Sequence, residues 1–207
     1  MAIGPVVFIV SMGVAVAMVR AGRMPPRTTA DATGFWVAPD RRFTITVFIG
    51  IVAFIPSGVL FTFLVPLGWI DLPLNAGMRI FGSIAFGMVT FIGIAGLIVA
   101  GRRGEAGHVK LTPAMVENTD ILSTRLFEWD DIDDVADHAT TRKAHRAVVL
   151  RLRDGREEII SMADVYLPGG AALYWLVRHY WRHPEDRAEL ADGRVAQRLR
   201  EGRFDLE

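Results

Sequence analysis

Two apolar runs decide the fold of this chain: FTITVFIGIVAFIPSGVLFTFLV at residues 43–65 and IFGSIAFGMVTFIGIAGLIVA at residues 80–100. Neither run contains Asp, Glu, Lys, Arg or His. An α-helix rises about 1.5 Å per residue, so about 20 apolar residues cross a hydrocarbon core of about 30 Å. The two runs therefore predict a transmembrane hairpin, whose connector includes residues 66–77.

A third apolar run lies near the N-terminus, where residues 2–19 carry no charge. A cleaved signal peptide is the alternative, but such peptides begin with basic residues, and here the arginines come after the run. We therefore expect residues 1–19 to form an uncleaved first transmembrane helix. The transmembrane hairpin then takes residues 43–100.

The composition divides the chain into a membrane-like half and a soluble half. The first hundred residues hold three acidic groups and six arginines, whereas the rest hold 20 acidic and 17 basic groups. We expect a cytoplasmic domain over residues 101–183 and a polar helix or tail over residues 184–207. The absence of cysteine excludes disulfides, thiolate metal sites and thiol catalysis.

Residues 20–42 read as a basic loop, and Pro25-Pro26 favours an extended or turn conformation there. Its arginines serve either to set the topology or to contact anionic lipids, and tryptophans nearby would suit a membrane interface. The candidate interface or lipid-contacting residues are Arg20, Arg23, Arg41, Arg42, Arg102, Arg103, Trp36 and Trp69.

The arginine distribution also predicts an orientation. Loop 20–42 and the residues after the third span are rich in arginine, whereas the connector region offers only Arg79. Positive charges favour the cytoplasmic side, so the N-terminus is expected outside and the C-terminal domain in the cytoplasm. With 21 arginines and two lysines, the composition suggests a GC-rich bacterium, so the expected location is the bacterial plasma membrane.

Small residues in the third span predict close helix packing. Ser83 and Gly87 form one small-xxx-small pair, and Gly96 and Ala100 form another. The partner helix can belong to this chain or to another protein. Pro56, near the middle of the second span, predicts a kink that is packed against a neighbouring helix.

The C-terminal region alternates short apolar runs with turn signals, which predicts several β-strands. The dipeptide Asp154-Gly155 indicates a two-residue hairpin, and in that register Arg151 faces Glu158. An amphipathic helix is expected over residues 170–183. After Pro184, a second and more polar helix is expected over residues 185–200.

The motifs of this region resemble the bacterial PH-like domains of small membrane-anchored proteins of the actinobacterial type. The resemblance rests on Lys110-Leu111-Thr112-Pro113, on Phe127-Glu128-Trp129-Asp130-Asp131-Ile132, and on the hairpin at residues 148–155 followed by a closing helix. It implies a β-barrel or half-barrel that is capped by a C-terminal helix and used for binding or scaffolding. The residues expected in the domain core or at a partner surface are Trp129, Ile132, Trp175 and Trp181.

No pattern in the chain indicates catalysis, a cofactor or a metal site. The acidic stretch at residues 128–137 lacks the glycine and the spaced glutamate of a calcium loop. His179 and His183 lie one helical turn apart but have no third ligand in sequence range. The acidic balance of the last 107 residues argues against nucleic acid as a partner.

These observations predict a membrane α-helical protein with three transmembrane helices and a small cytoplasmic α+β domain. We expect a non-enzymatic accessory or scaffold protein whose domain binds a protein partner within a larger membrane complex. Other membrane proteins and membrane lipids are the expected partners. The alternative is a protein that senses or handles anionic lipid at the inner leaflet.

Overall fold

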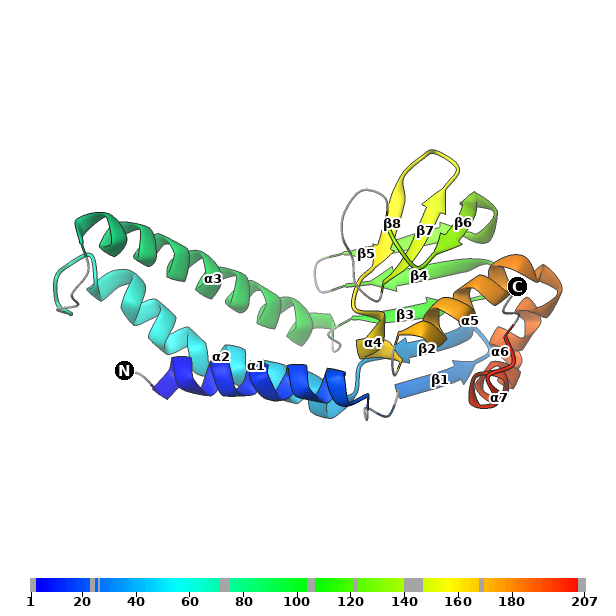
Figure 1. Cartoon of the computed structure of the whole chain (residues 1–207), viewed down its shortest axis with the longest axis horizontal. Helices are drawn as coiled ribbons and strands as arrows, with labels where there is room; N and C mark the ends of the chain where they lie inside the picture. The colour runs from blue at the N-terminus through cyan, green and yellow to red at the C-terminus, as the bar shows by residue number, and fades with distance from the viewer. Residues whose placement is uncertain are drawn as a thin grey trace. The chain divides into compact units, whose positions relative to one another are not determined.

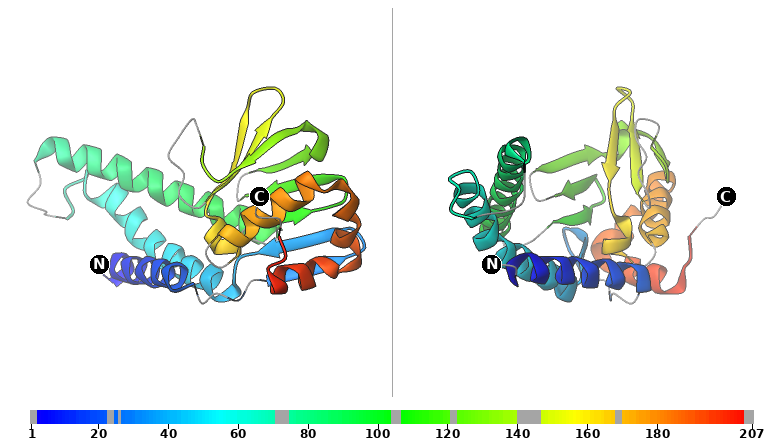
Figure 2. Two further views of the ribbon diagram at one scale, coloured as in Figure 1. Left: turned by 45° about the vertical axis from the view of Figure 1, so that its right-hand side comes forward. Right: turned by 60° about the vertical axis from the view of Figure 1, so that its left-hand side comes forward.

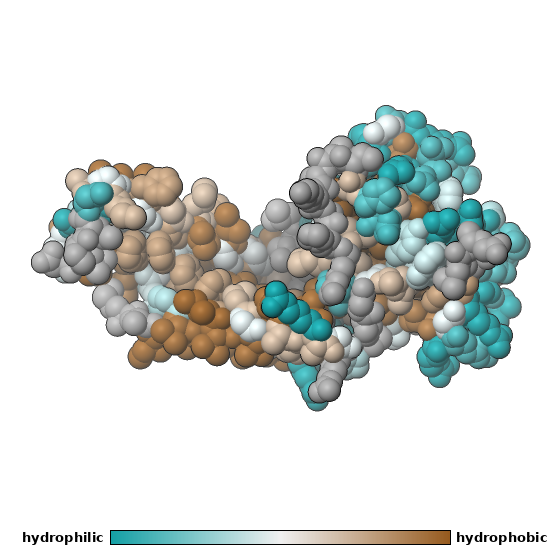
Figure 3. Space-filling view, viewed as in Figure 1, coloured by the Kyte–Doolittle hydropathy of each residue, from teal (hydrophilic) through white to brown (hydrophobic). Residues whose placement is uncertain are grey.

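A computed structural model describes residues 3–22, 25, 27–70, 75–103, 107–120, 123–139, 147–167 and 170–204. The chain divides into two units, which Figure 1 shows. The helical unit consists of Met1–Ala17 and Arg42–Glu105, and the sheet unit consists of Met18–Arg41 and Ala106–Glu207. Figure 3 shows a mostly apolar surface on the helices and a mostly hydrophilic surface on the sheet unit.

Three long helices form the helical unit: α1 (Ile3–Ala21), α2 (Arg41–Leu64) and α3 (Ala76–Arg103). Each is long and apolar enough to cross a membrane, so the three predicted apolar helices are confirmed. α2 continues through Pro56. Many large apolar side chains of these helices are exposed, as expected where lipid takes the place of a protein core.

Small residues set the distance between α1 and α2. If Gly4 were replaced by a larger residue, its Cβ atom would lie 2.5 Å from the carbonyl oxygen of Ala53. A Cβ atom added at Gly50 would lie 2.9 Å from Cβ of Ser11. Such distances leave no room for a side chain, so glycine lets the two helices approach closely. Because the contacting residue numbers change in opposite directions, the helices run antiparallel.

The contact between α2 and α3 combines glycine with threonine. A Cβ atom on Gly87 would lie 3.0 Å from Cγ2 of Thr62, and one on Gly58 would lie 3.3 Å from Cβ of Thr90. The hydroxyls of Thr90 and Thr62 lie in this contact, and each donates a 2.7 Å hydrogen bond to a carbonyl of its own helix. Gly87 of the predicted packing motif therefore contacts α2 of the same chain.

The sheet unit contains two antiparallel sheets. The first has five strands in chain order: β1 (Arg27–Asp31), β2 (Gly34–Ala38), β3 (His108–Leu111), β4 (Met115–Thr119) and β5 (Thr124–Glu128). A short 3₁₀ turn, η1 (Trp129–Asp131), leads to the second sheet of β6 (Ile132–Ala136), β7 (Val148–Leu152) and β8 (Glu157–Ile160). The strands of the two sheets cross steeply, and they do not close into a barrel (Figure 2).

The structure corrects the prediction that residues 20–42 are only a basic loop. Residues 27–38 form the hairpin of β1 and β2, and β2 pairs with β3, more than 70 residues later. Phe35 and Val37 are fully buried in the domain core. Trp36 points to the opposite face, where its ring lies 5.5 Å from the Arg27 guanidinium and 5.6 Å from the His108 ring.

The helix α5 (Ala171–Arg182) packs on this core through Leu173, Leu176 and Tyr180, all fully buried. The indole of Trp181 donates a 3.0 Å hydrogen bond to the carbonyl of Ile132, which ties α5 to β6. Trp129 is also buried, and its indole donates to the carbonyl of Thr112. Before α5 lies the one-turn helix α4 (Ala163–Tyr166).

The C-terminal region differs from the predicted polar helix. It forms η2 (Pro184–Ala188), α6 (Glu189–Asp192) and α7 (Arg194–Glu201). Gly193, with a φ of 84°, breaks the helix between α6 and α7. Leu190 and Val195 are fully buried, and these helices contact β1 and β2, so this segment completes the domain core.

The predicted register of the β7–β8 hairpin is wrong by one residue. Leu152 donates its amide to the carbonyl of Arg156, and Gly155 adopts a φ of 84°. The loop therefore has three residues, a common hairpin form with glycine in the left-handed position. Arg151 consequently pairs with Glu157, and Glu158 lies opposite Leu150 on the buried face.

We expect Phe35→Ala to destabilise the sheet unit by about 3–5 kcal/mol, because it removes a fully buried ring from the core. The measurement is denaturant unfolding of the full chain in detergent, followed by tryptophan fluorescence. Thr29→Ala, on the exposed face of the same hairpin, is the matched control and should change stability little. Equal, small effects from both variants would contradict the placement of this hairpin in the core.

Candidate functional site

The sheet unit has a groove between β5 and the β7–β8 hairpin, strands that Figure 1 labels. Its volume is about 740 Å³. The groove marks the place where the two sheets diverge. It is lined by Arg125, Leu126, Phe127, Asp131, Leu152, Arg153, Asp154, Arg156, Glu157 and Glu158.

A polar cluster bridges the two sheets at this groove. Glu158 on β8 is only 7% exposed, and it accepts hydrogen bonds from Asn118 Nδ2 at 2.9 Å and from Arg125 Nη1 at 2.5 Å. The hydrogen bond to Glu158 raises the pKa of Arg125 above its ordinary value. A carboxylate that is mostly removed from water needs such partners, so the cluster holds β8 to β4 and β5.

Among the residues that the structure describes, no strand pairs with the edge of β5 that faces away from β4. In the β4–β5 hairpin, Asp120 donates its amide to Ser123, and Trp129 donates to Ala114. Hydrogen-bonded and non-hydrogen-bonded pairs alternate along an antiparallel ladder. From this alternation, the backbone groups of Thr124, Leu126 and Glu128 point away from β4, toward the open edge.

Two of the other three sheet edges, those of β6 and β1, have features that oppose pairing with further strands. β6 contains a bulge between Ile132 and Asp134, and bulges and charges are common protection at edges. β1 is contacted by α6 and α7. In contrast, β5 pairs regularly, contains neither lysine nor proline, and exposes 59% of Leu126.

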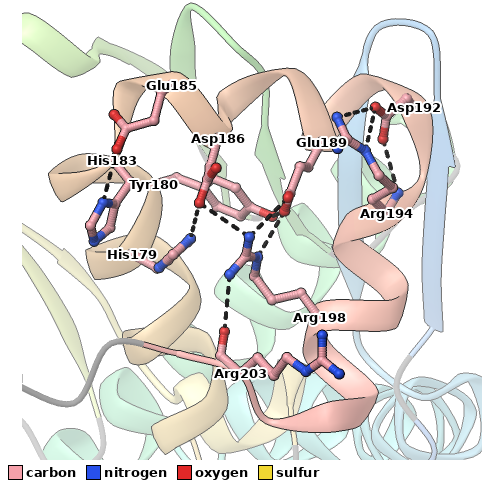
Figure 4. Close-up of polar contacts among 10 residues, drawn as sticks. All are labelled: His179, Tyr180, His183, Glu185, Asp186, Glu189, Asp192, Arg194, Arg198 and Arg203. Atoms are coloured by element: carbon pink, nitrogen blue, oxygen red, sulfur yellow. Dashed lines mark hydrogen bonds and ion pairs between the residues drawn. The ribbon is translucent and has the colours of Figure 1, made fainter.

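A second polar cluster joins α5 to the C-terminal helices (Figure 4). Arg198 of α7 donates to both carboxylate oxygens of Glu189, at 2.7 and 2.8 Å, and to Asp186 at 3.1 Å. Tyr180 donates to Glu189, and a ring nitrogen of His179 lies 3.0 Å from Asp186. This cluster joins four consecutive elements around the buried ring of Tyr180.

The pKa values in this cluster reflect its burial and its charges. Burial, together with the charge of Arg198, lowers the pKa of His179 below 6.5 despite the hydrogen bond to Asp186. Burial and the carboxylate of Glu189 raise the pKa of Tyr180. The hydrogen bond from Arg198 lowers the pKa of Glu189. Because the charged groups are half-buried and paired with one another around the buried His179 and Tyr180, we assign the cluster a structural role.

The predicted membrane-interface arginines lie at the ends of helices. Arg20 is in the last turn of α1, Arg41 and Arg42 begin α2, and Arg102 is in the last turn of α3. Because successive helices run antiparallel, these ends lie on the same side of the helical unit. Arg23 lies outside the described residues, as does the side chain of Arg103.

The opposite ends of α2 and α3 carry Arg79, which has a structural contact. Its guanidinium donates a 3.1 Å hydrogen bond to the carbonyl of Val65, just after α2. Trp69, also at this end, is 78% exposed. Of the predicted packing residues besides Gly87, Ser83 and Ala100 are buried and Gly96 is half-buried.

The predicted partner-surface tryptophans divide between two environments. Trp129 and Trp181 use their indole N–H groups within the domain, as described above. Trp175 is half-buried, and the guanidinium of Arg178 lies 5.8 Å from its ring and hydrogen-bonds the hydroxyl of Tyr174. Among the residues that the structure describes, no three His, Asp or Glu side chains gather as metal ligands.

Comparison with protein-family models, with curated proteins and with solved structures finds no match for this chain.

The groove was not among the sequence-predicted sites. Its residues come largely from β5 and the β7–β8 hairpin. The predicted register of that hairpin was wrong by one residue, and it placed Glu158 opposite Arg151 instead of in the groove. The local signal that could have indicated it is the alternation in TRLFE at residues 124–128, which puts Leu126 on the same strand face as Thr124 and Glu128.

We expect Arg125→Met to destabilise the sheet unit by about 1–3 kcal/mol, because it leaves the mostly buried Glu158 carboxylate with Asn118 alone. Adding Glu158→Gln should recover part of this loss by removing the charge. Denaturant unfolding of the full chain measures both. Arg156→Met, which breaks an exposed pair with Asp154, is the control and should have no measurable effect. If the double variant Arg125→Met/Glu158→Gln were no more stable than Arg125→Met, the proposed role of Glu158 in connecting β8 to β4 and β5 would be contradicted.

The lowered pKa of His179 predicts a pH dependence of stability. The unfolded chain binds a proton at this residue near pH 6.5, whereas the folded chain binds it only at lower pH. Stability from this group is therefore complete above pH 6.5 and falls as the pH drops toward the folded pKa. Unfolding of the full chain at stepwise pH between about 7.5 and 5 measures the slope.

His179→Gln should flatten this pH dependence, and His138→Gln should keep the wild-type dependence because that ring is exposed. An unchanged slope in His179→Gln would show that this histidine does not carry the effect.

Proposed function

We propose that the chain is a membrane-anchored accessory or scaffold protein whose sheet unit binds a protein partner. The observation that carries the proposal is the groove of about 740 Å³ beside the open edge of β5. Exposed backbone donors and acceptors beside a concave wall are a typical way for a domain to recognise another polypeptide. The proposed setting is a larger membrane complex in which this chain is a subunit or an assembly factor.

The helical unit supports an anchoring role. Its apolar runs contain no ionisable side chain in residues 43–65 or 80–100, and such side chains commonly mark ion or proton pathways. Its glycine and threonine contacts hold α1, α2 and α3 together. The exposed apolar faces of these helices are suited to lipid or to further membrane helices.

The sheet unit supports a PH-like binding domain as its proposed class. The sheet unit has two antiparallel sheets followed by a helix. This is the general arrangement that the motifs quoted above imply, although the sheets do not close into a barrel. Arginines at one end of the three helices favour a cytoplasmic location for this end and for the domain that follows α3.

A second candidate function, contact with anionic lipid, is favoured by the same arginines. Arg41, Arg42 and Arg102 lie at helix ends, where basic side chains meet lipid head groups. These residues would then hold negatively charged lipids at the inner leaflet, and the sheet unit would respond to them.

We expect the full chain, tagged and purified in mild detergent, to retain a protein partner in fixed stoichiometry. Mass spectrometry of the purified sample identifies what stays bound, and lipid analysis of the same sample counts anionic lipid. A lone chain with no protein would refute the accessory role. If that chain retained anionic lipid, and a combined Arg41→Gln, Arg42→Gln and Arg102→Gln variant lost it, the lipid function would be supported instead.

The full chain is required for this measurement. A fragment that begins near residue 105 lacks β1 and β2, so it lacks two of the five strands of the first sheet.

A further inference from the structure

We propose that the groove receives an extended segment of the partner protein, which adds to β5 as a sixth strand of the first sheet. This inference rests on the proposed function and names the way in which the partner binds. Its occupant is defined by chemistry: a polypeptide in extended conformation with its backbone hydrogen-bonding groups free on the side that faces β5.

The backbone of β5 provides the recognition surface. Thr124, Leu126 and Glu128 present their N–H and C=O groups to the open edge, at every second residue. An added strand would pair with all three, at the strand spacing of about 4.7–4.9 Å. Main-chain hydrogen bonds of this kind supply affinity for an extended segment whatever its side chains.

The opposite wall of the groove also has the character of a strand edge. In the β7–β8 hairpin, Leu152 pairs through its amide with Arg156, so the alternation directs the backbone of Glu157 and Ile159 away from β7. A strand bound on β5 therefore meets a second polar backbone surface on β8. An inserted segment is exposed to solvent along less of its length than a strand on an isolated edge.

Side chains of the groove define what the segment should carry. Leu126 is exposed on the outer face of β5, so an apolar residue of the segment is expected opposite it. Phe127 and Leu152 line the inner wall. Asp131 and Arg153 line the groove with opposite charges, so these two residues favour neither a positively nor a negatively charged segment.

A second copy of this chain is a poorer occupant. Its own β5 is paired with β4, so pairing β5 with β5 would bring β4 of the second copy, and the sheet behind it, toward the β7–β8 hairpin. An extended segment that belongs to no sheet avoids this obstruction.

The test is photo-crosslinking in native membranes with the full chain. A benzophenone amino acid replaces Thr124, Leu126 or Glu128 in three separate variants, and Thr29 on the exposed side of β1 in a control. Strand addition predicts that all three positions form adducts with one partner. The partner residues linked to positions 124, 126 and 128 should be two apart in the partner's sequence. Their order should rise along the partner for a parallel strand and fall for an antiparallel strand. The control should give no adduct to that segment. Adducts without such order, or none from the three positions, would overturn the proposal.

A backbone variant tests the hydrogen bonds themselves. Leu126→Pro removes an amide that points away from β4, so the β4–β5 ladder keeps its bonds, whereas an added strand loses one. In the protein with benzophenone at position 128, Leu126→Pro and Leu126→Thr both lose the leucine side chain, but only Leu126→Pro loses the amide. The adduct yield of Leu126→Pro should therefore be about tenfold below that of Leu126→Thr. Unfolding measurements establish that both variants are folded. Equal yields from the two variants would refute strand addition.

The design separates this inference from the proposed function. If a protein partner copurifies but its crosslinks come from other surfaces of the sheet unit, strand addition fails and the accessory role stands. If no protein copurifies and no position yields a protein adduct, both fail.

Discussion

The pairing of β2 with β3 is the interaction on which the rest of the structure depends. Phe35 lies opposite Leu111 and Val37 opposite Val109, although α2 and α3 separate the two strands in the chain. The transmembrane hairpin is therefore an insertion between neighbouring strands, and its two ends must return to positions one strand spacing apart. An antiparallel pair of helices, held close by glycine, meets this requirement because it brings the chain back to the side from which it left.

This pairing also determines which sheet edge remains open. With β1 and β2 added at one side, the first sheet extends to five strands, and α6 and α7 contact its β1 end. At the other end, η1 turns the chain into the second sheet, and the two sheets diverge beside β5. Glu158, with Asn118 and Arg125, limits that divergence by connecting β8 to β4 and β5. The groove thus lies where the two sheets diverge without closing into a barrel.

The two polar clusters of the sheet unit have different consequences. In the cluster of Arg198, Glu189, Asp186 and His179, Arg198 pairs with both carboxylates, and these contacts connect α5 to the C-terminal helices. The cluster around Glu158 lies at a concave surface, where Arg125 is still half exposed. A buried network of the first kind favours a single arrangement of helices, whereas the second leaves groups accessible beside the free backbone of β5. Binding is therefore proposed at the second cluster and not at the first.

The sequence by itself determined the three apolar helices, the presence of several strands with a hairpin at Asp154-Gly155, and the amphipathic helix α5, because each depends on composition or periodicity within a short window. Trp129 and Ile132 were also predictable as core residues. Only the tertiary structure decided that residues 27–38 belong to the sheet, that Gly193 divides the last helices around buried Leu190 and Val195, and that Glu158 faces the groove. The physical reason is that strand pairing and register depend on partners far away in the chain. A loop longer by one residue moves every side chain of a hairpin to a new partner, and local sequence patterns specify such loops weakly.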